Sequence, residues 1–333
     1  MKNSNNNKSI ILYVPSYFHG FREIIEKHLG QMGFEVYSIK DSPDRFKLRG
    51  ILKPLVRISR RVLLGDRNYQ SNLNEIRLEK LVAEQLKMVE MADYALIFRP
   101  DELSIKSLKQ IKSKTAAMYA YQWDGFARFP RIFERLKLFK KVYSIDVNDV
   151  RAENNVFPEK NFFFDTDFTV SPQVKERHDR AAYYIGVYER KRVKRLQLIV
   201  NQLSELKIKT EINLLGCPVI MPAWVNRLKK SKQYVDVINE VKSSNIIIDI
   251  DVRETHDVLT FRIFEAIGYK KKLITTNELV KNCDFYHPSN IYVFNGSIDG
   301  LKKFLDEPMV SLPDEILKKH SFTEWVKRVL EIS

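Results

Sequence analysis

Short apolar runs alternate along the chain with longer segments in which apolar residues recur with helical spacing. The first run covers residues 9–15 and is followed by the amphipathic segment 21–33, which ends at a glycine. Strands buried on both faces read as continuous apolar runs, and the connecting helices show a period of about 3.6 residues. The same criteria predict strands at 34–39, 93–98, 115–121 and 140–146, and helices at 74–91 and 102–114.

The alternation stops between residues 154 and 180 and then starts again. This interval holds two prolines and the aromatic run 161–168, and we interpret it as the connection between two domains. After it, strands are predicted at 181–188, 211–216, 245–252, 271–276 and 290–294, and helices at 192–206, 234–244, 259–268 and 322–333.

Strands that alternate with helices in this way form doubly wound parallel sheets, which bind ligands at the carboxyl ends of their strands. We therefore predict an α/β protein made of two Rossmann-like doubly wound domains facing each other across a cleft. The predicted domains cover residues 1–165 and 166–312. A C-terminal helix in 313–333 is expected to cross back to the first domain.

Composition narrows the class of protein and of partner. The 333 residues suffice for two domains, and Cys217 and Cys283 stand too far apart in sequence to suggest a disulfide scaffold or a zinc site. The chain shows neither a targeting segment nor a membrane-spanning run, so we expect a cytoplasmic protein. The net charge of +14 indicates an acidic partner, which can be a nucleic acid, an anionic membrane surface or a phosphate-bearing small molecule.

The segment 257–277 reads as an amphipathic helix, a glycine, a basic turn and a buried strand. It resembles the donor-site segment of GT-B glycosyltransferases, which implies that 166–312 is the nucleotide-sugar-binding domain and 1–165 the acceptor-binding domain. The resemblance implies that Glu265 accepts hydrogen bonds from the donor ribose and that Asp257 takes the place of a second glutamate. Arg262 and Thr260 are assigned to the donor site with them. The alternative is that Arg262 and Glu265 form an ion pair within the helix.

The segment 183–196 places a strand with Gly186 before a helix whose first turns are rich in Arg and Lys. Positive side chains at a helix N-terminus oppose the helix dipole, unless an anion such as a diphosphate sits there. The GT-B resemblance likewise implies a basic residue that contacts the diphosphate. We assign Arg192 to this role and Arg190 as a second choice; the alternative is a solvated basic face.

In the first half, candidate acceptor-site residues follow two predicted strands. His19 lies in the loop after the first strand and is a candidate base, although lone histidines are often structural. Asp124 follows the strand 115–121 and is a second candidate base; the alternative is that it caps the next helix. Trp123 and Phe126 are candidates for stacking on an acceptor sugar.

The stretch 123–150 resembles a group of bacterial polysaccharide glycosyltransferases and the spore-maturation-type enzymes related to them. In these proteins an aspartate after the strand is followed by a helix and by an apolar strand that ends in aspartate, which Asp146 and Asp149 match. This resemblance implies a role in capsule, lipopolysaccharide or O-antigen synthesis.

Two D-x-D tripeptides, at 165–167 and 249–251, raise the alternative of a divalent metal on the donor diphosphate. The tripeptide is too short to be specific, and the repeated alternation favours a metal-independent enzyme without a cofactor. A basic amphipathic segment at 45–67 is either a membrane-binding segment, peripheral at the inner face of the plasma membrane, or a helix with a solvated basic face.

Together these features predict a glycosyltransferase that moves a sugar from a nucleotide sugar to a hydroxyl of a saccharide or lipid-linked saccharide. The competing hypotheses are a nucleic-acid-binding protein, a sugar-nucleotide epimerase on the same fold, and an inactive GT-B-like interaction protein. No dinucleotide fingerprint or P-loop occurs, and we expect no nucleic-acid partner.

Overall fold

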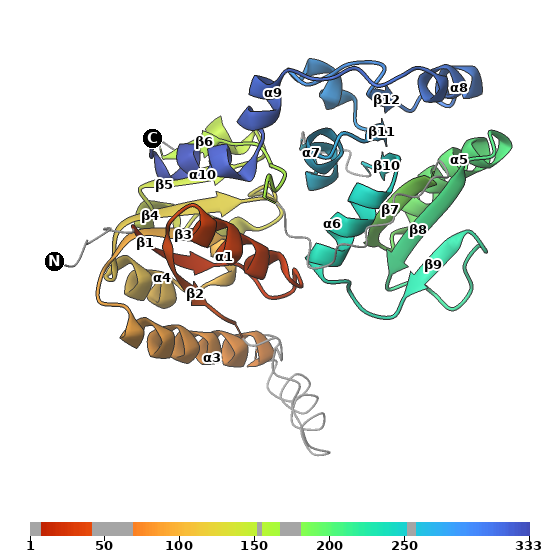
Figure 1. Ribbon diagram of the computed structural model, residues 1–333. Coiled ribbons are helices and arrows are strands. Elements are labelled where there is room, and N and C mark those ends of the chain that lie inside the picture. Colours follow the sequence, from red (N-terminus) through yellow and green to blue (C-terminus); the bar gives the residue numbers. More distant parts are fainter. Residues whose placement is uncertain (1–7, 42–68, 152–154, 167–180, 252–257) are drawn as a thin grey trace. The chain divides into compact units, whose positions relative to one another are not determined.

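The computed structural model describes residues 8–41, 69–151, 155–166, 181–251 and 258–333. The chain divides into two compact units (Figure 1). The first comprises residues 1–144 and 148–158, and the second comprises 145–147 and 159–333. The basic segment 45–67 and Asp257 lie outside the described residues. Membrane binding by the segment and a donor-site role for Asp257 therefore stay predictions.

The first unit is built on a parallel sheet of six strands in the order β2-β1-β3-β4-β5-β6. The strands are β1 (Ser9–Tyr13), β2 (Glu35–Ile39), β3 (Ala92–Phe98), β4 (Thr115–Gln122), β5 (Lys141–Ser144) and β6 (Val156–Pro158). Its α-helices are α1 (Phe21–Gln31), α3 (Tyr69–Gln85) and α4 (Ile105–Lys112). The central strands are buried on both faces, which is why they appear in the sequence as uninterrupted apolar runs.

The predicted helix after Asp124 is wrong. Residues 130–138 form two short 3-10 turns, η3 (Pro130–Ile132) and η4 (Leu136–Leu138), in place of an α-helix. Pro130 starts the first turn, and the Arg135 side chain donates to the backbone carbonyl of Leu103 and of Arg131. The bond to Leu103 spans 32 residues and ties the segment to a distant part of the chain, so helical spacing in the sequence is not sufficient to make it helical.

The second unit repeats the architecture with six parallel strands in the order β12-β11-β10-β7-β8-β9. The strands are β7 (Ala181–Val187), β8 (Lys209–Leu215), β9 (Val225–Leu228), β10 (Ile246–Asp249), β11 (Lys272–Thr275) and β12 (Ile291–Val293). The helices are α5 (Arg190–Glu205), α6 (Tyr234–Ser243), α7 (Phe261–Gly268), α8 (Ile298–Asp306), α9 (Asp314–Lys319) and α10 (Phe322–Leu330). The predicted fold class, two Rossmann-like doubly wound domains, is therefore confirmed.

The aromatic run read as a linker is a structural part of the second unit. Phe162, Phe163 and Phe164 are buried, and their rings contact α7 and α10. The indole Nε1 of Trp325 on α10 donates to the backbone carbonyl of Lys160, at 3.1 Å. This packing explains why the units divide after Pro158, ahead of the boundary expected at 165/166. The crossing of the last helix to the first unit stays a prediction.

Gly268 ends α7 where the Phe163 ring lies against the helix. A Cβ atom at this position would lie 2.1 Å from the ring Cγ, so we expect Gly268→Ala to destabilise the second unit. The expected cost is about 1–3 kcal/mol, as for other overpacked cores. Scanning calorimetry measures it as a lowered melting temperature.

Gly30 provides the matched control. It lies inside α1, and a Cβ there would meet no atom within 4 Å. Gly30→Ala should therefore stabilise the protein by about 0.5–1 kcal/mol through helix propensity. A Gly268→Ala protein as stable as the wild type would contradict the close approach of Phe163.

Within the described ranges, no helix combines the length and the apolar composition that a membrane crossing requires.

Candidate functional site

In the second sheet, the order in which strands are added reverses between β7 and β10. The chain leaves β7 toward β8 on one side, whereas β10 pairs on the other side. Pairing with β8 continues to Val187, but pairing with β10 involves only Ala182 and Tyr183. The backbone after Tyr183 is therefore open toward β10, at the kind of switch point where doubly wound sheets bind ligands.

Two arginines contact this open end of β7. Arg262, on the first turn of α7, donates to the carbonyl oxygen of Ile185 and lies over the Tyr184 ring, 5.1 Å from its centroid. Arg192, on the first turn of α5, donates from Nη1 to the carbonyl oxygen of Val187 at 2.6 Å. The structure thus brings together two residues that the sequence separates widely.

Each of these guanidinium groups retains an unused donor. Among the described residues, the buried Nε atoms of Arg192 and Arg262 have no hydrogen-bond partner. Arg192 also approaches Glu189 at 3.5 Å, but within the described part of the chain Arg262 does not pair with Glu265. Buried donors are nearly always satisfied in proteins, so two unsatisfied guanidinium N–H groups at a switch point indicate a site for an anion.

Gly186 lies between the two carbonyl groups that bind these arginines. A Cβ atom there would lie 2.7 Å from the hydroxyl of Tyr184. Arg190 is the first residue of α5 and is exposed. The structure therefore places Arg192 against the end of the strand and leaves Arg190 exposed to solvent.

Glu265 lies in the core-facing part of α7 and is only 3% exposed. Its Oε1 accepts a hydrogen bond from the hydroxyl of Tyr234, the first residue of α6. Burial raises the pKa of the Glu265 carboxyl, while the bond from Tyr234 and the charge of Arg262 oppose this rise. The carboxylate is therefore held by one partner through Oε1 and retains acceptor capacity on Oε2.

Thr260 and Asp249 are part of a buried network at the N-terminus of α7. The Thr260 hydroxyl donates to Asp249 Oδ1 at 2.8 Å, and Thr275 donates to Asp249 Oδ2 at 2.8 Å. This network joins the carboxyl ends of β10 and β11 to the start of α7. Asp249 therefore positions the helix that carries Arg262 and Glu265.

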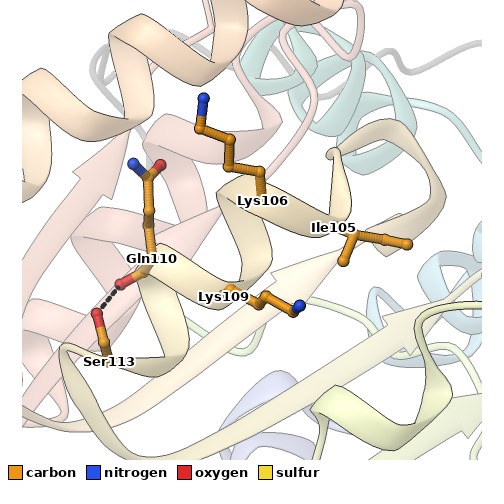
Figure 2. A pocket seen from close by; sticks show the side chains of 5 residues that line it. All are labelled: Ile105, Lys106, Lys109, Gln110 and Ser113. Atoms are coloured by element: carbon orange, nitrogen blue, oxygen red, sulfur yellow. Dashed lines mark hydrogen bonds between the residues drawn. The ribbon is translucent and has the colours of Figure 1, made fainter.

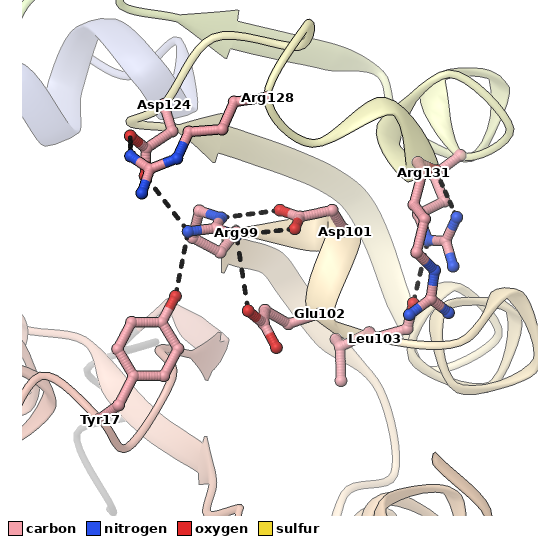
Figure 3. Close-up of polar contacts among 9 residues, drawn as sticks. Tyr17, Arg99, Asp101, Glu102, Leu103, Asp124, Arg128 and Arg131 are labelled. Atoms are coloured by element: carbon pink, nitrogen blue, oxygen red, sulfur yellow. Dashed lines mark hydrogen bonds and ion pairs between the residues drawn. The ribbon is translucent and has the colours of Figure 1, made fainter. Parts of the chain in front are cut away.

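The first sheet has its own switch point, between β1 and β3, where Arg99 is buried. Its guanidinium group binds Asp101 through two hydrogen bonds of 2.8 Å each and contacts Glu102 at 3.4 Å. Nη1 also donates to the Tyr17 hydroxyl at 3.1 Å and to Asp124 at 3.3 Å (Figure 3). Side chains from the ends of β1, β3 and β4 thus converge on one guanidinium group.

Arg99 also has an unusual backbone conformation. Its φ of 54° lies in the left-handed region, which costs free energy for a residue with a Cβ. Strained residues of this kind cluster at functional sites, where the surrounding contacts hold them in place. The side-chain contacts of Arg99 are such contacts.

Asp124 has two cationic partners. Arg99 contacts it at 3.3 Å, and the exposed Arg128 contacts its Oδ1 at 3.0 Å. No α-helix follows Asp124, so it does not have the helix-capping role that was the alternative. Its partners hold the carboxylate at the carboxyl end of β4.

The two predicted stacking residues lie deeper than expected. Phe126 is 1% exposed and belongs to the hydrophobic core, and its backbone N–H donates to Asp149. Trp123 is buried among Phe18, Phe21 and Phe98, with centroid distances of 4.6, 5.7 and 5.4 Å. Neither ring presents an open face, whereas Phe18 beside them is 40% exposed.

His19 is exposed in the loop that joins β1 to α1. The loop is anchored by Ser16, whose N–H and hydroxyl both donate to Asp41 Oδ2 at 3.1 Å. Gly20 follows with a φ of 79° and precedes the first turn of α1. His19 therefore lies two residues after Tyr17 of the Arg99 cluster, and the two loops that carry His19 and Arg99 follow the neighbouring strands β1 and β3.

The D-x-D carboxylates have structural partners. Asp165 Oδ1 accepts from the backbone N–H of Thr323 in the first turn of α10, at 3.1 Å, and Asp249 accepts from two threonines. Asp167 lies outside the described residues. Across the described ranges, the side chains of His, Cys, Asp and Glu form no group of three suited to a metal ion.

Sequence reasoning did not identify Arg99, Tyr17 or Tyr234. A signal for Arg99 exists, because Arg, Pro, Asp and Glu follow directly on the apolar run 93–98, at the carboxyl end of a strand. Tyr234 carries no such signal, because its partner lies on another helix.

A groove of about 630 Å³ lies on the outer face of α4 (Figure 2). It is lined by Ile105, Lys106, Lys109, Gln110 and Ser113. All five side chains come from this helix and its C-terminal cap, and none belongs to the strand ends where the two clusters lie. We therefore do not include it in the functional site.

No family model and no curated protein matches this sequence. Solved structures do match it, over almost its whole length. An α-glucosyltransferase in complex with UDP and a 13-mer DNA containing an HMU base aligns with a TM-score of 0.56 and 11% identity, covering 97% of this chain and 99% of that one.

Two further structures agree with this result. A glycosyltransferase from Rickettsia africae ESF-5 gives a TM-score of 0.52 at 16% identity, covering 98% of this chain and 100% of that chain. The apo lipopolysaccharide outer core galactosyltransferase WaaB gives 0.50 at 11%, covering 97% and 99%. At this level of identity the likeness concerns the fold, and the chain has the two-domain GT-B glycosyltransferase fold throughout.

Proposed function

We propose that this protein is a glycosyltransferase that transfers a sugar from a nucleoside diphosphate sugar to an acceptor hydroxyl. The observation that carries the proposal is the pair of unsatisfied guanidinium donors, on Arg192 and Arg262, beside the open end of β7. A diphosphate supplies acceptor oxygens to both of them. Fixed positive groups there would also stabilise the charge on the leaving diphosphate, in place of a metal ion.

Glu265 is the proposed ribose ligand. A carboxylate only accepts hydrogen bonds, which suits the two hydroxyl donors of a ribose. Tyr234 holds one oxygen of the carboxylate and so fixes its orientation. Thr260 and Asp249 support the same helix from its N-terminus.

Asp124 is the proposed base in the first unit. Arg99 and Arg128 hold its carboxylate, and the cluster contains three carboxylates, Asp101, Glu102 and Asp124, against these two arginines. An excess of acceptors suits a hydroxyl-rich acceptor better than a phosphate-rich one. His19 is the second candidate base.

The solved neighbours narrow the substrates to be tested. One neighbour is described with UDP and with UDP-glucose, which favours a uridine diphosphate donor. Another is a lipopolysaccharide galactosyltransferase, which favours a saccharide or lipid-linked saccharide acceptor in surface polysaccharide synthesis. The DNA in the first neighbour makes DNA the acceptor class to compare against.

A panel of UDP, GDP, CMP and dTDP compounds tests the donor site by thermal shift, first with a chelator present and then with added magnesium. We expect one nucleoside diphosphate to raise the melting temperature, because a ligand that binds only the folded state stabilises it by about 2.7 kcal/mol at 100 times its Kd. Stabilisation by none of these compounds, with or without magnesium, would overturn the proposed donor site. Transfer from the matching nucleotide sugar to saccharides or DNA then identifies the acceptor.

A further inference from the structure

The connection between β8 and β9 exposes two adjacent aliphatic side chains. Val219 is 81% exposed and Ile220 is 90% exposed. They lie in residues 216–224, next to β9, which forms one edge of the second sheet (Figure 1). Isolated exposed aliphatic residues are common, but two in succession at the tip of a connection form a small apolar surface.

The base of this connection is firmly packed. Cys217, Met221 and Trp224 pack against the hydrophobic core of the second unit. The Trp224 indole Nε1 also donates to Gln197 Oε1 on α5, at 3.0 Å. Because the apolar residues on either side are anchored to the core, Val219 and Ile220 are held outward by the structure of the connection.

Positive charge surrounds this apolar tip. Residues 212–235 contain no Asp or Glu, and they include Arg227, Lys229, Lys230 and Lys232. Arg227, Lys229 and Lys230 are exposed, and Lys232 pairs with Glu240. The Arg227 guanidinium donates to the carbonyl oxygen of Val219 at 2.8 Å, which keeps a cation directly beside the tip.

We propose that this connection docks the second unit onto an anionic lipid bilayer. Val219 and Ile220 enter the interface between headgroups and acyl chains, while Arg227, Lys229 and Lys230 contact anionic headgroups. Apolar area and positive charge together are what interfacial binding requires. A nucleic acid fits the charge but not the tip, because single-stranded bases stack on aromatic side chains and not on Val or Ile.

Vesicle co-sedimentation tests the proposal with phosphatidylcholine vesicles that do or do not contain phosphatidylglycerol. We expect the wild type to bind the anionic vesicles, and the double variant Val219→Ser with Ile220→Ser to bind about tenfold or more weakly, because both apolar side chains are lost. Lys229→Gln with Lys230→Gln should weaken binding by about fivefold for each charge removed.

Two variants make the test specific to this connection. Leu198→Ser removes an aliphatic side chain that is 58% exposed on α5 of the same unit, and it should leave binding unchanged. Ile220→Trp should bind at least as tightly as the wild type, and brominated lipid should quench its added fluorescence. The basic segment 45–67 is identical in every variant, so differences between them report on this connection alone.

Three outcomes would overturn the proposal: no vesicle binding by the wild type, equal binding by the double serine variant, or binding to a nucleic acid that depends on Ile220. The test does not use the nucleotide site, so its result is independent of the proposed transferase activity.

Discussion

Glu265→Ala should abolish the stabilisation of this protein by its nucleoside diphosphate. The variant removes the carboxylate that would accept from the two ribose hydroxyls, and each hydrogen bond to a charged group contributes about 1.5–3 kcal/mol. Together these losses weaken nucleotide affinity by about 100-fold or more. Titration calorimetry measures the affinity directly and separates it from the stability of the free protein.

The isosteric variant Glu265→Gln separates binding from packing. Its single amide oxygen can still accept from Tyr234, so the buried contact is kept, but Tyr234 and the ribose must then share this one acceptor oxygen. We expect an intermediate loss of affinity, about tenfold. Glu205→Gln, at the exposed end of α5, is the matched control and should bind like the wild type.

The pH dependence of binding provides a further check. Burial raises the pKa of Glu265 above its ordinary value of 4.5, so the carboxyl becomes protonated at a higher pH than an exposed glutamate. Nucleotide affinity should therefore fall as the pH is lowered through this raised pKa, and Glu265→Gln should remove that component. The stability of the protein without nucleotide should instead rise as the pH is lowered through this range, because a raised pKa in the folded state favours folding at low pH.

Unchanged affinity in both Glu265 variants would exclude this residue from the site. The Arg192 and Arg262 donors would then have to be satisfied by an anion without a ribose, such as a simple phosphate ester.

Arg99→Met should destabilise the first unit by about 3–5 kcal/mol, the usual cost of removing one partner from a buried ion pair. Asp101 is also buried and would lose both of its 2.8 Å hydrogen bonds from the guanidinium group. Methionine fills much of the same volume, so the loss measures the charge and hydrogen bonds more than a cavity. Urea unfolding followed by fluorescence, or calorimetry, gives the free energy of unfolding.

Arg128→Met is the matched control because it removes a guanidinium group from the same carboxylate, Asp124. Arg128 is exposed, so its ion pair with Asp124 contributes less than about 1 kcal/mol. Arg99→Lys keeps the charge but cannot bind Asp101 through a planar fork, and its stability should lie between the wild type and Arg99→Met. Equal effects of Arg99→Met and Arg128→Met would show that the buried network does not hold the loops together.

Local pattern was sufficient to predict the architecture. The central strands are largely buried on both faces, so runs such as residues 95–98 and 246–248 are apolar throughout and can be recognised without knowing their neighbours. Arg262 and Glu265 could be placed on one helix because the helical period is itself local. The same reasoning failed after Asp124, where long-range contacts of Arg135 set the conformation.

Pairings between distant segments required the tertiary structure. Arg262 binds the backbone of Ile185 and Glu265 binds Tyr234, and neither pairing leaves a trace in the spacing of residues. The short strands β6 and β9 also went unpredicted, because they are edge strands of only three and four residues, too short to show a pattern.

The amino-acid sequence by itself determined that this chain forms two doubly wound α/β domains, and it pointed to charged residues such as Arg192, Arg262 and Asp124 near strand ends. Only the tertiary structure showed that Arg192 and Arg262 both bind the backbone of β7, and that Tyr17, Asp101 and Asp124 surround Arg99. The physical reason is the distance along the sequence over which each interaction acts. Secondary structure follows from periodicities within about ten to twenty residues. The partners of a buried charged group depend on which distant residues the packed sheets bring within hydrogen-bond distance.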